Sequence, residues 1–178
     1  CASAREPLAL WAKIGNAQRL TAVDRAAALR DLHPGMPVVV ARGMRPSLRL
    51  VEADMRADEE LLAAIADWCR RFTPLAALDP PDGIVLDVSG VGHLFGGDEG
   101  LLRSVEDALE EQGFARRVAL APHAGAAMAF AQFGGPRLVR DEASLEKAVR
   151  ALPVAALRLD DKAALRLRDA GLRSLGDL

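Results

Sequence analysis

The sequence predicts an α/β fold in which a split β-sheet is joined by a crossover helix. Residues 84–88 (Ile-Val-Leu-Asp-Val) are rich in β-branched side chains and are typical of a strand. Residues 98–112 then repeat leucine and valine at helical spacing, and residues 117–121 form a second apolar strand. A strand, a helix and a strand in this order indicate a ferredoxin-like split βαβ unit.

The strand at residues 84–88 carries one carboxylate, Asp87, which we place in mid-strand with turns at both ends. The preceding stretch Pro80-Pro81-Asp82-Gly83 is a turn, because proline presets φ and glycine accepts positive φ. Asp82 is therefore first of all a turn residue, and a role as a metal ligand is the less common case.

The N-terminal stretch predicts a hairpin followed by a short helix. Residues 8–11 and 19–23 are two short strands, and Ile14-Gly15-Asn16 forms the tip between them. Residues 24–32 form a helix that Asp24 caps. Residues 46–51 are expected to be a loop and a short strand.

Helices account for most of the remaining chain. The spacing of apolar residues predicts helices at residues 58–72, 124–133, 141–151 and 162–170, with Ser174 capping a further one. Residues 137–139 follow a Gly-Gly-Pro break and are expected to form a short edge strand.

Composition limits the function classes. The chain has 178 residues, of which 51% are hydrophobic, so it can bury a core of one or two small domains. The formal net charge of −2 gives no strong overall field for nucleic acid, so any DNA contact needs a local patch or another part of the protein.

Cys1 and Cys69 lie far apart and have no metal-binding spacing, which favours a reduced, cytoplasmic protein. No apolar run reaches the length of a membrane span, and no signal peptide is visible. The start at Cys1 and the stop at Leu178, inside a new helix, indicate a fragment of a longer protein.

Two motifs carry a resemblance to a known family. Leu86-Asp87-Val88-Ser89-Gly90 resembles the end of the palm motif of Y-family (translesion) DNA polymerases, Ser-Ile-Asp-Glu-Ala-Tyr-Leu-Asp-Val-Thr. Gly92-His93-Leu94-Phe95-Gly96-Gly97 resembles the ImuB-type branch of that family, which is regarded as having lost the polymerase site.

The resemblance implies a polymerase-palm sheet with a small fingers part and the beginning of a helical thumb. Residues 1–54 would be fingers-like, without the palm strand that precedes them in the family. Residues 55–140 would be palm-like, and residues 141–178 thumb-like with a helix-hairpin-helix remnant.

The resemblance implies that the metal site has degenerated. A two-metal polymerase needs clustered carboxylates around Mg²⁺. The family's Asp-Glu pair falls on Asp82 and Gly83, so the glutamate is missing. We therefore assign no catalytic residue and no metal, and expect Mg²⁺ only if the chain is an active polymerase with shifted acids such as Asp79, Asp82 and Asp87.

The same resemblance implies that the grip on nucleotide and DNA is weak. The fingers Tyr and Arg that hold a triphosphate fall on Arg25 and Ala28, and two family lysines fall on Ala124 and Met128. Leu159-Asp160-Asp161 stands where the thumb normally has a Gly-Ile-Gly turn. The candidates for a weak DNA-backbone contact are the arginines of this region, although a solvated basic face is equally consistent with them: Arg158, Arg166, Arg168 and Arg173.

The function that the resemblance implies is that of a non-catalytic adaptor in damage-induced (SOS) mutagenesis, translesion synthesis and DNA repair. Its partners would be an error-prone replicative-type DNA polymerase, an ImuA-type protein and the sliding clamp, with contacts beyond Leu178 and weak or no DNA binding by this part. An active Y-family polymerase is one alternative, and a palm-fold interaction module is another.

A third alternative rests on Gly96-Gly97-Asp98-Glu99-Gly100, which nearly matches the Gly-Gly-Asp-Glu-Phe motif of diguanylate cyclases. A cyclase needs a hairpin at this motif. The apolar residues that follow have helical spacing, so Asp98 and Glu99 read more simply as a helix cap and first-turn acids.

Overall fold

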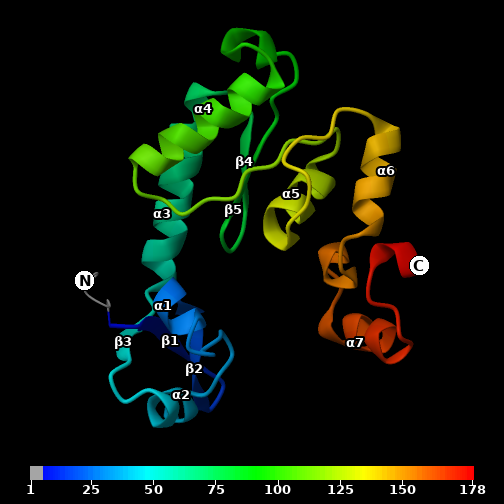
Figure 1. Cartoon of the computed structure of the whole chain (residues 1–178). Helices are drawn as coiled ribbons and strands as arrows, with labels where there is room; N and C mark the ends of the chain where they lie inside the picture. Colours follow the sequence, from blue (N-terminus) through cyan, green and yellow to red (C-terminus); the bar gives the residue numbers. More distant parts are fainter. Residues whose placement is uncertain (1–5) are drawn as a thin grey trace. The chain divides into compact units, whose positions relative to one another are not determined.

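The computed structural model describes residues 6–178. It is a mixed α/β structure that divides into two compact units, one ending at Asp58 and the other running from Glu59 to Leu178 (Figure 1). Each unit has its own small sheet. The division into fingers-like, palm-like and thumb-like parts stays a prediction.

The first unit is built on a three-stranded sheet in the order β2-β1-β3. β1 (Leu8–Ile14) and β2 (Ala17–Val23) are antiparallel, and the turn between them contains Gly15 at φ +62°. The predicted hairpin is confirmed, with both strands reaching further toward the tip. β3 (Arg49–Glu52) lies parallel to β1.

Two short helices pack on this sheet. α1 (Arg25–Ala28) is capped by Asp24, whose Oδ1 accepts a hydrogen bond of 2.7 Å from the Ala27 amide. This helix is shorter than predicted, because the chain turns after Ala28 and Asp31 takes the left-handed φ of +62°. α2 (Val38–Met44) was not predicted, since three consecutive valines favour a strand. Burial of Val38 and Ala41 in the core of the unit favours the helix instead.

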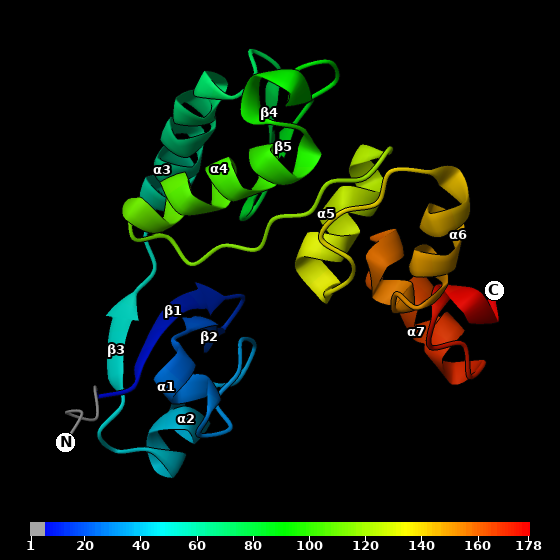
Figure 2. The same cartoon turned by 45° about the horizontal axis from the view of Figure 1, so that its top comes forward.

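In the second unit, two helices lie side by side against a hairpin (Figures 1 and 2). α3 (Met55–Trp68) begins before the unit boundary and continues into a 3-10 helix, Cys69–Arg71. α4 (Asp98–Glu111) matches its prediction closely. They share a core with the hairpin strand β5, with these members buried: Cys69, Phe72, Leu101 and Val105.

The hairpin consists of β4 (Ala76–Asp79) and β5 (Gly83–Leu86), which are antiparallel and pair Asp79 with Gly83. The prediction that Asp87 lies in mid-strand is wrong, because β5 ends at Leu86. The Asp87 carboxylate accepts a hydrogen bond of 3.0 Å from the Ser89 amide, and this local turn ends the strand. This hydrogen bond lowers the pKa of Asp87.

The rest of the second unit is helical. Its helices are α5 (Ala124–Phe133), α6 (Glu142–Arg150) and α7 (Asp161–Asp169), and two 3-10 helices cover Val154–Leu157 and Leu175–Asp177. Asp141 and Asp160 cap α6 and α7, and Ser174 forms the predicted cap as part of a capping box with Asp177. None of the helices in residues 6–178 has the length and apolarity that a membrane crossing requires.

The strands predicted at residues 117–121 and 137–139 shrink to one parallel bridge between Leu120 and Leu138. Leu120 donates to the Arg137 carbonyl at 2.8 Å, and Val139 donates to the Leu120 carbonyl at 2.9 Å. The ladder stays short because Pro136 precedes these few residues and Asp141 caps the helix after them.

Candidate functional site at the β4–β5 hairpin

The turn between β4 and β5 contains the position to which the sequence assigned the catalytic acid pair. Asp82 lies in the turn and is exposed, and Gly83 is the first residue of β5. Pro80 and Pro81 are joined by a cis peptide bond in the same turn. The hairpin therefore presents one carboxylate of the expected pair.

Gly83 has no room for a side chain. A Cβ atom built on it would lie 2.7 Å from the carbonyl oxygen of Asp79 and 2.8 Å from Asp79 Oδ2, closer than real Cβ atoms approach such atoms. Any side chain at position 83, glutamate included, would force the hairpin or Asp79 to move. The packing of Asp79 against Gly83 therefore leaves no space for an acidic side chain at position 83.

Asp79 is held by an arginine from a distant part of the chain. Arg158 Nη1 and Nη2 each donate to one carboxylate oxygen of Asp79 at 2.5 Å, in a bidentate pair. The hydrogen bonds from Arg158 lower the pKa of Asp79. In turn, the hydrogen bond to Asp79 and, less strongly, the nearby negative charge of Asp82 raise the pKa of Arg158. Asp79 therefore already has a cationic partner within the protein.

These hairpin residues do not by themselves form a two-metal centre. Asp79 is neutralised by Arg158, Gly83 offers no ligand and Asp87 bonds to Ser89. Within the part of the chain that the structure describes, no three His, Cys, Asp or Glu side chains are grouped to hold a metal ion. We derive no metal-dependent step from these residues.

The positions expected to grip a triphosphate lie on two separate helices. In the first unit, Arg25 and Ala28 are the first and last residues of α1, and both are exposed. In the second unit, Ala124 and Met128 lie on α5, and neither brings a positive charge. His123 directly precedes α5, and its Nε2 atom lies 3.1 Å from Oε1 of Glu142, the first residue of α6. This contact links the two helices.

The predicted DNA-backbone arginines divide into two groups. Arg158 is paired with Asp79 and has a side chain 45% exposed. Arg166, Arg168 and Arg173 are exposed and form no ion pair with any other described side chain. Asp160 accepts a hydrogen bond of 2.8 Å from the Ala163 amide, so the turn before α7 uses an acid to cap the helix.

The stretch that resembles a cyclase motif adopts a different structure. Gly92–Phe95 form a 3-10 helix and α4 begins at Asp98. The cyclase alternative predicts a hairpin here, and that prediction is wrong. Arg140 Nε donates to Asp98 at 3.1 Å and its Nη2 donates to Glu99 at 3.3 Å. These acids tie α4 to the segment after α5.

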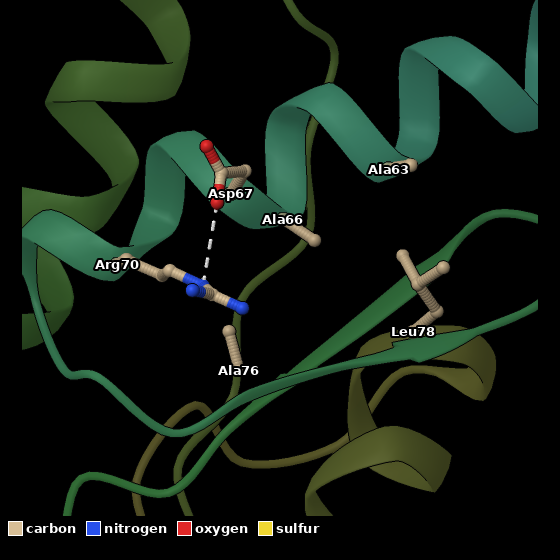
Figure 3. A pocket seen from close by; sticks show the side chains of 6 residues that line it. All are labelled: Ala63, Ala66, Asp67, Arg70, Ala76 and Leu78. Carbon is tan, nitrogen blue, oxygen red and sulfur yellow. Dashed lines mark ion pairs between the residues drawn. The ribbon is translucent and has the colours of Figure 1, made fainter.

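A shallow hollow of about 230 Å³ lies between α3 and β4 (Figure 3). Its lining consists of small or aliphatic side chains and one ion pair: Ala63, Ala66, Asp67, Arg70, Ala76 and Leu78. Asp67 and Arg70 neutralise each other at 3.4 Å, so the hollow offers no net charge to a phosphate. It is a poor nucleotide site.

Asp79 and Arg158 fall in different predicted elements, and the sequence gives no sign that they pair. They lie 79 positions apart, and no local pattern signals that one faces the other. Gly83 was noted for its missing carboxylate, but its close contact with Asp79 depends on the hairpin register.

Solved structures show what kind of fold this is. The crystal structure of DinB from Sulfolobus solfataricus matches with a TM-score of 0.75, covering 97% of this chain and 52% of that chain at 19% identity. The insertion ternary complex of Dbh DNA polymerase matches with a TM-score of 0.79, covering 97% and 53% at 20% identity. The fold is therefore that of Y-family DNA polymerases.

Sequence similarity narrows this class. Residues 4–131 match the impB/mucB/samB (IMS) family, and the chain belongs to it. Protein ImuB of Caulobacter vibrioides, in strain NA1000 / CB15N and in strain ATCC 19089 / CB 15, is 39% identical over 147 residues. That similarity covers 83% of this chain and 32% of the relative, so the chain spans about a third of the curated relatives' length.

Proposed function

We propose that this chain is part of an ImuB-type protein that has the Y-family fold but no polymerase chemistry of its own. The protein would act as an adaptor in damage-induced mutagenesis and translesion DNA synthesis. Gly83 is the observation that supports this most directly. The family's metal-binding glutamate falls there, and the close approach of Asp79 leaves no space for it.

The pairing of Asp79 with Arg158 supports the same proposal. An active enzyme that used Asp79 as a substitute ligand would first have to break a bidentate ion pair. A cation already satisfies this carboxylate, so a divalent ion gains less by binding there. Of the matched acid pair this chain retains Asp82, whereas the two-metal mechanism uses a cluster of carboxylates.

The adaptor role extends to three partners by family resemblance. These are an error-prone replicative-type DNA polymerase, an ImuA-type protein and the sliding clamp. Because the chain spans only part of its ImuB relatives, we place the partner contacts mainly outside it.

A calorimetric titration of the full-length protein with Mg²⁺ and a dNTP, run beside a primer-extension assay, tests the loss of catalysis. We expect no saturable metal-dependent nucleotide binding and no extension. The adaptor role is tested on the same preparation by gel filtration with each partner, where a co-eluting complex is expected.

The competing candidate is an active polymerase with a rearranged site around Asp82, the carboxylate at the matched position of the turn. It predicts saturable binding and primer extension that Asp82→Ala abolishes. Either of those results, reproduced in the full-length protein, would overturn the non-catalytic proposal.

A further inference from the structure

The ion pair between Arg158 and Asp79 joins two parts of the chain that lie 79 positions apart in sequence. Asp79 is the last residue of β4, and Arg158 follows the 3-10 helix Val154–Leu157, just before α7. Both guanidinium Nη atoms are used on the two carboxylate oxygens. Gly83 makes this possible, because a side chain there would collide with Asp79.

Residues of both charges follow Arg158 in sequence, and the cations among them are open to solvent. Lys162 and Arg166 line a shallow hollow at the start of α7, together with Asp160, which caps the helix, and the apolar side chains of Leu159 and Leu167. Neither Lys162 nor Arg166 forms an ion pair with another described side chain. Both are exposed cations that suit the phosphates of a nucleic-acid backbone.

Of the cations Arg158, Lys162 and Arg166, only Arg158 forms an ion pair with another described side chain. A guanidinium binds a phosphate with the same two-pronged geometry that it uses for a carboxylate. The Arg158 side chain is 45% exposed, so a phosphate can reach it without unfolding the hairpin. Asp79 and a DNA phosphate therefore compete for the same group.

We propose that Asp79 withholds Arg158 from a nucleic-acid-binding surface formed by Lys162 and Arg166 at the start of α7. The ion pair is an autoinhibitory contact that keeps DNA binding by this part of the protein weak. Releasing Arg158 adds one phosphate contact to the surface. The inference rests on the proposed role of the chain in DNA transactions but does not depend on its loss of catalysis.

The test is a fluorescence-anisotropy titration of the full-length protein with a labelled primer–template duplex, without dNTP, at several salt concentrations. Asp79→Asn keeps the size of the side chain and removes its charge. We expect it to tighten binding several-fold at low salt. One additional phosphate contact also steepens the dependence of log K on log salt by about 0.9.

Epistasis separates this mechanism from a general change in charge. Arg158→Gln is expected to cancel the gain of Asp79→Asn in the double variant. Asp67→Asn is the matched control, because Asp67 is an exposed acid of the same unit that pairs with a different arginine, Arg70. It should produce no gain.

The inference is overturned if Asp67→Asn tightens binding as much as Asp79→Asn, or if the double variant keeps the gain. It is also overturned if Asp79→Asn and Asp79→Ser, both shown by circular dichroism to be folded, bind no better than the unchanged protein. Primer extension is measured separately, so a failure here leaves the non-catalytic proposal standing, and the reverse also holds.

Discussion

Gly83 and Asp79 face each other across the hairpin, and their contact decides what position 83 tolerates. We predict that Gly83→Glu, which places an acid where we expect the family's glutamate, produces no polymerase activity. It should also lower the free energy of unfolding by about 1–3 kcal/mol, the usual cost of overpacking. Primer extension and urea unfolding measure the two effects.

Gly125→Glu is the matched control for this substitution. Gly125 lies in the first turn of α5, and a Cβ there meets no atom within 4 Å. Glutamate favours a helix over glycine and suits its N-terminus, so this variant should be as stable as the unchanged protein or more so. If Gly83→Glu is equally stable, the steric account of position 83 is wrong.

Asp79 should also leave a signature in the pH dependence of stability. Arg158 lowers the pKa of Asp79, so the pair stabilises the folded state above the unfolded-state pKa of about 3.9. That contribution is lost as the pH falls through the lower, folded-state pKa. In urea unfolding, Asp79→Asn should be less stable than the unchanged protein at pH 7, and the difference should shrink below about pH 4. A difference that stays constant from pH 7 to pH 3 would contradict this.

At the scale of elements, the start of α4 depends on a glycine. A Cβ on Gly100 would lie 1.8 Å from the carbonyl oxygen of Phe95, in the 3-10 helix before it. Backbone on both sides of this contact leaves no flexible group to yield. We predict that Gly100→Ala costs about 3 kcal/mol or more, at the upper end of overpacking effects. Chemical denaturation measures this cost, and Gly125→Ala, in an open helical position, should stabilise the protein instead.

At the scale of the whole molecule, the two units have separate cores. Leu20 is buried in the first unit and Leu101 in the second. We predict that Leu20→Ala and Leu101→Ala each cost about 2–5 kcal/mol of local stability, because each leaves a cavity in its own core. Hydrogen exchange should show lost protection in β1 and β2 for the first variant and in α4 for the second. Equal losses in both units from either variant would show that the cores are coupled.

Much of the fold could be predicted from sequence because its signals are local. The leucine and valine spacing in α4, the cap at Asp24 and the turn at Gly15 depend on residues within a few positions of one another. α2 was missed for the opposite reason. Its valines favour a strand, and burial of Val38 and Ala41 overrides that local preference.

The α/β class and most of the helices could be predicted from the amino-acid sequence alone. Those features follow from residue type and local spacing. The three-dimensional structure was needed to find Asp79 beside Gly83 and Arg158 paired with it, because a hairpin register and a contact across 79 positions set these distances. It also decided that Asp98 and Glu99 bind Arg140 at the start of a helix, which depends on how α4 packs against a distant segment.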